Sequence, residues 1–407
     1  MVEQAASADA RDKTRQVFAL GITQTIAWAS STYLPAILAA PIAADLGITR
    51  ATVFGAFSVS LLVMAAAGPA AGRAIDLHGG RRVLALSNLV LAGGLALLAG
   101  AGNATLLFAA WCVLGAGMAL GLYDAAFATL VRLHGHGARG PITGITLIAG
   151  FASTVGWPLT TYLSAHFGWR ACCLAWAAIH LLIALPVNLL CIPKGGTDNT
   201  VSREATPAPG PDKLPAPSSA EQRKTFVLLA IFSAATAFVT SAMAAHLPGL
   251  MIATGVSAAV AVTAGALLGP AQVAARVMEF TIGQRLRIHP LSVARLATAL
   301  HPLGAAVIAL LFGLPLGAFA FSVLHGAGNG MITIAKGTLP LALFGPAGYG
   351  MRTGFLSVAA RGMQALAPFA FGLVLEGQGA GAALALSAGV SLIALFALLG
   401  LRTATHA

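Results

Sequence analysis

Charged residues are scarce in this sequence of 407 residues, where Asp, Glu, Lys and Arg together make up 9%. Soluble globular domains carry about 25% charged residues, so this scarcity excludes an ordinary soluble domain and a charged, disordered chain. Hydrophobic residues make up 58% of the sequence, and the mean hydropathy is +0.86. The composition therefore indicates a membrane protein that crosses the bilayer many times.

Cysteine is also rare, and a phosphate-binding loop of the form GxxxxGK[ST] is missing. The four cysteines lie in or beside apolar runs at no metal-ligand spacing, and they are Cys112, Cys172, Cys173 and Cys191. We interpret them as small buried hydrophobes, with a thiophilic metal at Cys172 and Cys173 as the alternative. The missing loop disfavours an ATP-driven pump. No nucleophile, metal or cofactor constellation indicates an enzyme, so we expect no enzyme activity, cofactor or bound metal.

Long apolar runs fill most of the chain, and about 20 apolar residues suffice for one helix to cross the hydrocarbon. The runs are continuous and rich in Leu, Ala and Gly, whereas a membrane barrel would show alternating segments of about 10 residues. The 47 glycines also favour closely packed helices. We predict an all-α membrane protein with twelve spans, at residues 17–40, 51–74, 83–101, 104–129, 142–165, 169–191, 225–250, 257–282, 293–313, 316–340, 352–375 and 380–401.

The basic residues fall on one side of this twelve-span map when the N-terminus is placed inside. The opposite loops hold only Arg50 and Arg170. This asymmetry follows the positive-inside rule and predicts that both termini and the middle loop are cytoplasmic. The first sixteen residues are polar and mixed in charge, unlike a cleaved signal peptide. Although the net charge is +11, no basic patch with interleaved aromatics indicates a nucleic-acid partner.

A stretch rich in Pro, Ser, Gly and charge divides the spans into six and six. It runs from 192 to 224 and reads as a flexible cytoplasmic linker. We therefore expect a cytoplasmic tail at 1–16, a six-helix half at 17–191, the linker, a second half at 225–402 and a tail at 403–407.

The two halves contain an internal repeat, which predicts a pseudo-symmetric pair. Residues 111–144 and 321–354 align without a gap at an offset of 210, pairing three glycines and one threonine with their counterparts: Gly135 with Gly345, Gly140 with Gly350, Gly144 with Gly354, and Thr143 with Thr353. The same offset pairs Pro158 with Pro368. Earlier in each half, "TYLP" answers "AHLP", so Tyr33 corresponds to His246. Two halves derived from one unit place a cavity at their interface.

The loop "GPAAGRAIDLHGGRRVL", residues 68–84, carries a conspicuous pattern between spans two and three. It has the form GxxxDxxGxRR, made by Gly72, Asp76, Gly79, Arg81 and Arg82. The pattern resembles the cytoplasmic loop signature of the major facilitator superfamily of secondary transporters. Together with twelve spans, a six-plus-six repeat and a central linker, the resemblance covers essentially the whole chain. It implies alternating access between two halves, a gating role for this loop, and the inner membrane of a bacterium. The matching loop of the second half has Gln284 where an acidic residue is expected.

Span eight contains three polar residues on one helical stripe. Gln272, Arg276 and Glu279 recur every three or four residues between Gly269 and Gly283. An arginine inside the hydrocarbon costs about 2.5–3.5 kcal/mol on insertion scales, so it is expected to face the bundle interior. In this position we expect Arg276 to bind an anionic substrate, Gln272 to orient the substrate, and Glu279 to exchange a proton. Alternatively, Arg276 and Glu279 only neutralise each other.

An arginine on span eight, preceded four residues earlier by a polar residue, resembles the monocarboxylate and oxalate/formate transporter branch. The monocarboxylate carriers have an aspartate at that earlier position, where this chain has Gln272. The oxalate/formate branch also has a basic residue on span eleven, which corresponds to Arg361 here. Two fixed cations favour an anion such as a carboxylate, which arginine grips with two hydrogen bonds. A structural pairing of Arg361 is the alternative.

Further candidates lie on spans one, four, seven and ten. His325 and Asn329 share a face of span ten and contact either the substrate or a neighbouring helix. His246 on span seven and Asp124 on span four are candidates for proton coupling, with an interfacial polar role as the alternative for His246.

Span one contributes the last candidates for substrate binding: Gln24, Trp28 and Tyr33. A packing role for Trp28 is equally compatible with the sequence. Span five lacks the GPxxGG arrangement that is associated with drug–proton antiporters.

The sequence therefore predicts a secondary transporter that moves a small organic anion across the inner membrane, coupled to protons. Its expected partners are the solute, protons and the lipid bilayer. A proton-driven exporter of drugs or toxic compounds is the first alternative. A membrane sensor that has a transporter fold but moves nothing is the second.

Overall fold

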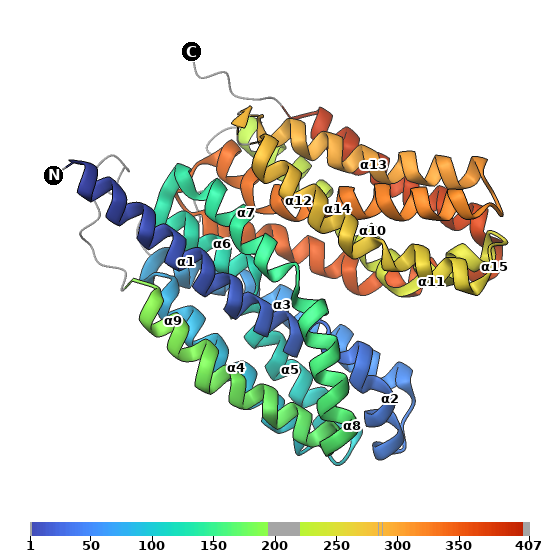
Figure 1. Cartoon of the computed structure of the whole chain (residues 1–407), viewed down its shortest axis with the longest axis horizontal. Helices are drawn as coiled ribbons and strands as arrows, with labels where there is room; N and C mark the ends of the chain where they lie inside the picture. Colours follow the sequence, from blue (N-terminus) through green and yellow to red (C-terminus); the bar gives the residue numbers. More distant parts are fainter. Residues whose placement is uncertain (1, 194–219, 284, 287, 402–407) are drawn as a thin grey trace. The chain divides into compact units, whose positions relative to one another are not determined.

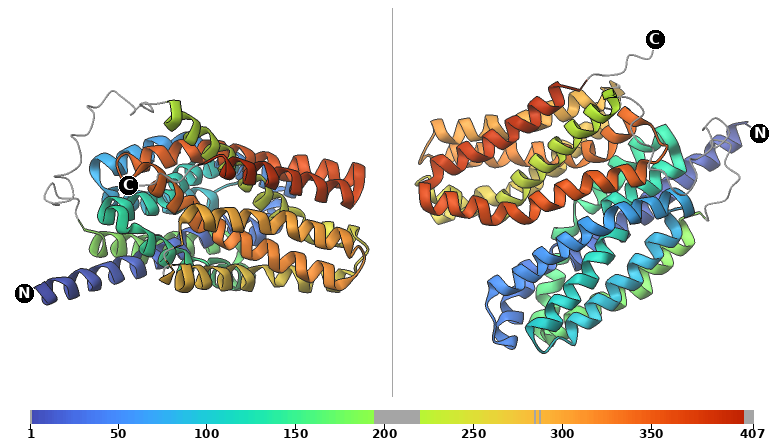
Figure 2. Two further views of the ribbon diagram at one scale, coloured as in Figure 1. Left: turned by 90° about the horizontal axis from the view of Figure 1, so that it is seen from above. Right: turned by 180° about the vertical axis from the view of Figure 1, so that it is seen from behind.

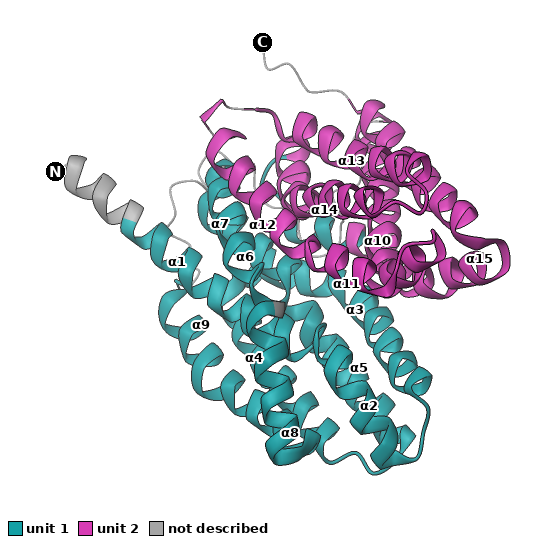
Figure 3. Ribbon diagram, turned by 45° about the vertical axis from the view of Figure 1, so that its right-hand side comes forward, with its two compact units in different colours: residues 1–208, 345–355 teal, residues 209–344, 356–407 magenta. Residues whose placement is uncertain are grey.

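The computed structural model describes residues 2–193, 220–283, 285–286 and 288–401 (Figure 1). Every regular element in those ranges is a helix, which confirms the all-α fold. Most of the expected linker, Gln284 and the tail 403–407 lie outside the described residues. The chain divides into two compact units, residues 1–208 with 345–355 and residues 209–344 with 356–407 (Figure 3). The expected halves differ from these units mainly in the segment 345–355, which groups with the first unit.

The first unit contains the following helices, including one 3-10 helix (η1) and one π-helix (η2): α1 Val2–Ser30, α2 Leu34–Leu46, α3 Arg50–His78, α4 Gly80–Ala99, α5 Ala104–Gly121, α6 Tyr123–His134, η1 Gly135–Ala138, α7 Arg139–Ala149, α8 Ala152–Ile179, η2 His180–Ala184 and α9 Leu185–Cys191. Helix α1 begins at Val2, within the expected tail at 1–16. The first turns of α15 also belong to this unit.

The second unit holds α10 Ala220–Ala253, α11 Ala258–Ala266, α12 Leu268–Met278, the π-helix η4 Glu279–Gly283, α13 Pro290–Leu310, α14 Pro315–Phe344 and most of α15 Tyr349–Leu399. Helices α13 and α14 lie side by side, and α12 packs against α14 (Figure 1 and Figure 2). Glycines permit this close approach. A Cβ atom on Gly330 would lie 2.5 Å from the Gln272 carbonyl oxygen, and one on Gly326 would lie 2.8 Å from that of Leu268.

Nine helical stretches in the described ranges are long and apolar enough to cross a membrane. Two of them are too long for one crossing, since Ala104–Cys191 has 88 residues and Tyr349–Leu399 has 51. Each contains a glycine with left-handed backbone, Gly168 at φ 82° and Gly379 at φ 83°, where two helices meet. Large apolar side chains are exposed on several helices, including Leu310 at 85% and Leu190 at 78%. Lipid is the natural solvent for such surfaces.

Two expected spans contain a break in the helix. Span one breaks at residues 31–33, between α1 and α2, and Pro35 at the start of α2 removes one backbone donor. Span four breaks at Leu122, whose extended backbone separates α5 from α6. Breaks of this kind are tolerated inside a membrane only where other groups satisfy the backbone.

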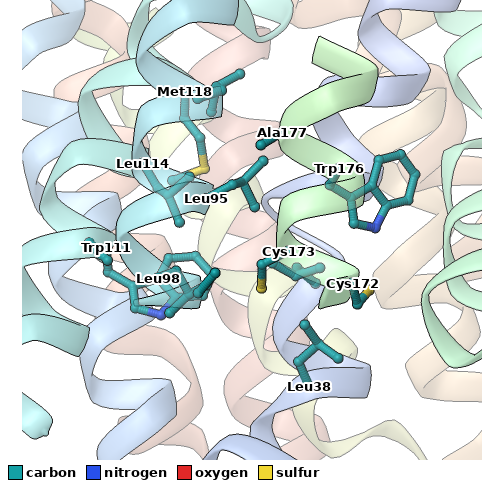
Figure 4. Packing of buried hydrophobic residues seen from close by; sticks show 14 of the residues in the cluster. Leu38, Leu95, Leu98, Trp111, Leu114, Met118, Cys172, Cys173, Trp176 and Ala177 are labelled. Carbon is teal, nitrogen blue, oxygen red and sulfur yellow. The ribbon is translucent and has the colours of Figure 1, made fainter. Parts of the chain in front are cut away.

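The core of the first unit consists of tightly packed apolar side chains. Trp111, Cys172 and Cys173 are fully buried there (Figure 4). The sulfhydryls pack among Leu, Met and Trp side chains, as expected of small hydrophobes. Cys112 and Cys191 are half-buried, and all four thiols are free. The corresponding core of the second unit gathers around Phe238, Phe321 and Phe371.

Candidate functional site

Arg276 is the most deeply buried arginine among the predicted site residues, with only 5% of its surface exposed. It lies in the last turn of α12, just before the chain widens into the π-helix η4. Nε donates to the Gly330 carbonyl at 3.3 Å, and Nη2 lies 3.5 Å from both Gln272 Oε1 and Thr333 Oγ1. Arg276 and Gln272 thus come together as the helical stripe predicts, and α14 supplies the other oxygens.

The contacts of Arg276 to these three oxygens are long and involve neutral acceptors. Charge-assisted bonds from arginine to a carboxylate are shorter, about 2.7–2.9 Å, and roughly twice as strong. A carboxylate that reached this guanidinium would therefore bind it better than the neutral oxygens do. Glu279, which is 5% exposed, occupies the first position of η4 and lies against Gly283, where a Cβ atom would be 3.4 Å from Glu279 Oε1. Single-turn π-helices occur often at functional sites.

Helix α14 carries a polar stripe at four-residue spacing that contacts three other helices. His325 Nδ1 lies 2.9 Å from Nδ1 of His301 on α13. One turn later, Asn329 Oδ1 accepts a 2.8 Å hydrogen bond from Thr240 Oγ1 on α10, and Thr333 follows beside Arg276. Both His325 and Asn329 make the interhelical contacts that the sequence left open as the alternative to substrate binding.

Arg361 on α15 is half-buried and donates through Nη1 to Gln364 Oε1 at 2.7 Å. The backbone carbonyl of Gln364 accepts a 2.8 Å hydrogen bond from Ser241 Oγ on α10. Farther along α10, His246 Nε2 bonds to the Pro368 carbonyl at 2.8 Å. These contacts fix α15 to α10 within the second unit, and they give His246 a structural role that the sequence analysis did not include.

The candidates in the first unit gather at the break between α5 and α6. Gln24, 1% exposed, donates through Nε2 to the Gly121 carbonyl at 2.5 Å, at the last residue of α5. The last carbonyls of a helix have no intrahelical donor, so Gln24 satisfies one of them. Asp124 lies in the first turn of α6, where a carboxylate is stabilised by the helix dipole.

Aromatic rings surround this break. Trp28 lies 5.0 Å from Tyr123 and 6.0 Å from Tyr33 between ring centroids, and Tyr33 contacts Trp157 edge-on at 5.9 Å. The packing role for Trp28 is therefore present in the structure. Two buried polar atoms in this group, Gln24 Oε1 and Trp28 Nε1, have no hydrogen-bond partner among the residues that the structure describes. Buried orphan atoms are rare in proteins and mark places where a ligand or water binds.

Sequence reasoning missed His301, Thr240, Thr333 and Gln364, and in the first unit it missed His180. His180 begins the π-helix η2 and bonds to Ser30 Oγ and Asn88 Oδ1, each at 2.8 Å. Each of these residues is a polar interruption in an apolar run, and that signal was available in the sequence. Their partners were not, because the contacts join residues up to 150 positions apart.

The last turn of α3 holds the first turn of α15 through Asp76, within the first unit. Asp76 accepts hydrogen bonds from the backbone amides of Gly350 at 2.9 Å and Met351 at 2.8 Å, while Arg132 donates to the Asp76 carbonyl. These amides are among the first of a helix, which lack intrahelical acceptors and favour a negative charge. Gly79 has a positive φ of 82° at the junction of α3 and α4.

The glycine at the start of the GxxxDxxGxRR pattern allows α3 to pack closely against α15, and its two arginines lie at or near the surface. A Cβ atom on Gly72 would collide with the carbonyl of Gly350, and one on Gly354 would lie 2.6 Å from the carbonyl of Gly68. Arg81 is half-buried and Arg82 is exposed. The structure explains one glycine pair of the internal repeat, because Gly135 and Gly345 both adopt a positive φ, at 55° and 72°.

A sequence profile described as the Major Facilitator Superfamily matches residues 20–321. The chain belongs to the Major Facilitator Superfamily. It is accordingly a multi-pass membrane transporter of that superfamily, which confirms the general class that the loop signature predicted. No curated protein matches the sequence.

Solved structures of superfamily members share the fold over nearly the whole chain. The human organic anion transporter MFSD10 (TETRAN) has 17% identity and a TM-score of 0.69, with 95% of this chain and 99% of that chain covered. The fucose:proton symporter FucP of E. coli has 16% identity and a TM-score of 0.70, covering 94% and 97%. The proton:xylose symporter XylE has 11% identity and a TM-score of 0.69, covering 94% and 95%. At these identities the likeness concerns the fold alone.

Proposed function

We propose that this superfamily member transports a small organic anion with at least one carboxylate, coupled to protons, across the inner membrane of a bacterium, with both chain termini cytoplasmic. The observation that carries the proposal is the buried Arg276 beside Gln272 and Thr333, within the stretch Ala258–Gly283 that is long and apolar enough to cross a membrane. A cation placed there is costly, and transporters use such residues in their substrate pathways.

The geometry of arginine explains why an anion is the proposed solute. The guanidinium presents a planar fork of donors that matches a carboxylate, whereas a neutral sugar offers only dipolar acceptors. Gln272, four residues earlier on α12, lies next to the fork and would orient the second end of the solute. Arg361 adds a second cation in the same unit, and Asn329 adds an amide one helical turn before Thr333.

The first unit would contribute Gln24, Trp28 and Tyr33 to substrate recognition. Gln24 Oε1 is a buried acceptor that has no described partner, so a hydroxyl or amide group of the solute could donate to it. The aromatic faces of Trp28 and Tyr33 would pack on the apolar part of a small solute. For proton coupling, Glu279, Asp124 and His246 remain the candidates from the sequence.

The test is counterflow in proteoliposomes loaded with a panel of short mono- and dicarboxylates. We expect saturable exchange of at least one of them, and loss of that exchange in Arg276→Gln. Arg295→Gln is the matched control, because Arg295 lies on α13 of the same unit and donates to the backbone carbonyls of Leu398 and Leu401.

Two outcomes would replace the proposal. Drug-dependent proton movement without exchange of any anion indicates the exporter. Tight ligand binding without any flux indicates a sensor. Full anion exchange by Arg276→Gln would remove Arg276 from the site while leaving anion transport in place.

A further inference from the structure

His301 and His325 form a buried imidazole pair between α13 and α14, helices that lie side by side in Figure 1. Each residue is 3% exposed, and their Nδ1 atoms are 2.9 Å apart. The ring of His325 stacks on Phe321 at 5.8 Å with an interplanar angle of 11°, and His301 meets the same phenylalanine at 67°. His301 Nε2 is buried and has no hydrogen-bond partner among the described residues.

Hydrogen-bond accounting shows that the pair can accept one additional proton in its present geometry. In the neutral pair one Nδ1 donates and the other accepts, so one ring carries its proton on Nδ1 and the other carries it on Nε2. When His301 is the donor, its Nε2 is a bare lone pair. A proton added to this lone pair leaves the contact between the Nδ1 atoms intact and makes it charge-assisted. A second added proton would place a hydrogen on both Nδ1 atoms and break the contact.

The surroundings do not supply a counter-charge for this proton. No carboxylate contacts either ring in the part of the chain that the structure describes. Helix α11 has no titratable residue. The titratable and charged residues on the other neighbouring helices are Glu221, Arg223, Lys224 and His246 on α10, Arg276 on α12, Glu279 on η4, Arg295 on α13, Lys336 on α14, and Tyr349, Arg352, Arg361 and Glu376 on α15.

We propose that His301 and His325 together form a one-proton binding site, and that the proton they hold strengthens the binding of the transported anion at Arg276. The proposal rests on the proposed function for its second part only. It adds His301 as a functional residue and reassigns His325 from substrate contact to proton carrier. The proton enters at Nε2 of His301 and is shared by the two Nδ1 atoms.

Helix α14 connects the pair to the anion site. The stripe from His325 to Thr333 spans eight residues, or about 12 Å of helix rise, and Gly330, which accepts from Arg276, lies about 7.5 Å along it. At a separation on the order of 10 Å, a positive charge on the pair raises the affinity for a monovalent anion about tenfold. Because binding linkage is reciprocal, anion binding favours protonation of the pair by the same factor.

Proton counting tests the first part without a substrate. The full chain in lipid nanodiscs is titrated from about pH 8 to pH 5, the range over which histidines change charge. Its proton uptake is compared with that of the double variant His301→Gln, His325→Gln. We expect the native protein to take up one proton more per chain. A difference of zero means that the pair is only structural, and a difference of two means two independent histidines; either result overturns the proposal.

The second part is tested by the binding of lactate and formate, which stay ionised throughout this range. We expect about tenfold tighter binding at pH 5.5 than at pH 7.5, and no such dependence in either His301→Gln or His325→Gln. Saturable binding of either carboxylate at pH 7.5 shows that a variant is folded. His166→Gln, at an exposed histidine of α8, is the control and should behave as the native protein.

The failures are distinguishable. Binding with the same affinity at both pH values refutes the coupling but leaves the anion site in place. If binding still depends on pH in both variants, groups other than this pair hold the proton. When neither carboxylate binds at either pH, the proposed function fails for these solutes, and the proton count still decides whether the pair exists as a site.

Discussion

Replacing Asp76 by Asn should release the first turn of α15. The carboxylate accepts two backbone hydrogen bonds, from Gly350 and Met351 at 2.9 and 2.8 Å. Asparagine is nearly the same size, but it keeps only one acceptor oxygen and loses the negative charge. Since hydrogen bonds to charged groups contribute about 1.5–3 kcal/mol each, we expect the contact to weaken by about 2 kcal/mol.

Amide hydrogen exchange reports this contact directly. The first amides of a helix have no intrahelical acceptor, so the protection of Gly350 and Met351 depends on Asp76. A loss of about 2 kcal/mol corresponds to about 30-fold faster exchange of these amides. The measurement is hydrogen exchange with mass spectrometry on the peptide that covers residues 349–356.

Asp12→Asn is the matched control, since Asp12 is exposed and lies 3.7 Å from Arg15. Its exchange at residues 349–356 should equal that of the native protein. Unchanged exchange in Asp76→Asn would refute the capping role of the carboxylate.

Two further substitutions test the packing that supports these sites. Gly354→Ala should lower the midpoint of thermal unfolding, because its Cβ atom would lie 2.6 Å from the Gly68 carbonyl and overpacking costs about 1–3 kcal/mol. Gly362→Ala on the same helix meets nothing within 4 Å and should not lower the midpoint; equal effects of the two would contradict the close contact. Gln24→Leu should cost about 1–3 kcal/mol in thermal unfolding, because the Gly121 carbonyl loses its donor. An unchanged midpoint would show that water replaces the amide.

The class of fold and part of the site could be predicted from the sequence because both depend on local patterns. The length of an apolar run alone shows whether it can span the bilayer, and residues at three- and four-residue spacing lie on one face of a helix. This is why Gln272 and Arg276 were expected to lie together and do so. The glycines of the repeat were visible for the same reason, since a positive φ at Gly135 and Gly345 restricts both positions to similar residues.

The rest depends on contacts between helices, which leave no periodic signal. The break at Leu122 is stabilised by Gln24, which lies 97 positions away from the carbonyl it binds. The π-helix that begins at Glu279 adds about one residue to a single helical turn. A hydropathy pattern does not detect so small a change. His325 was predicted as a candidate because it shares a helical face with Asn329. His301 has no such neighbour in the sequence pattern, and only the fold places its Nδ1 atom 2.9 Å from that of His325.

The central claim is that the fork of Arg276 grips a carboxylate, and the substitution Arg276→Lys tests it most directly. Lysine keeps the positive charge but offers no planar pair of donors. The measurement is the apparent affinity for the exchanged carboxylate in counterflow, with Arg295→Lys as the control. We predict a loss of at least about tenfold in Arg276→Lys, because one charge-assisted hydrogen bond is lost, and native affinity in Arg295→Lys. Native affinity in Arg276→Lys would contradict the account.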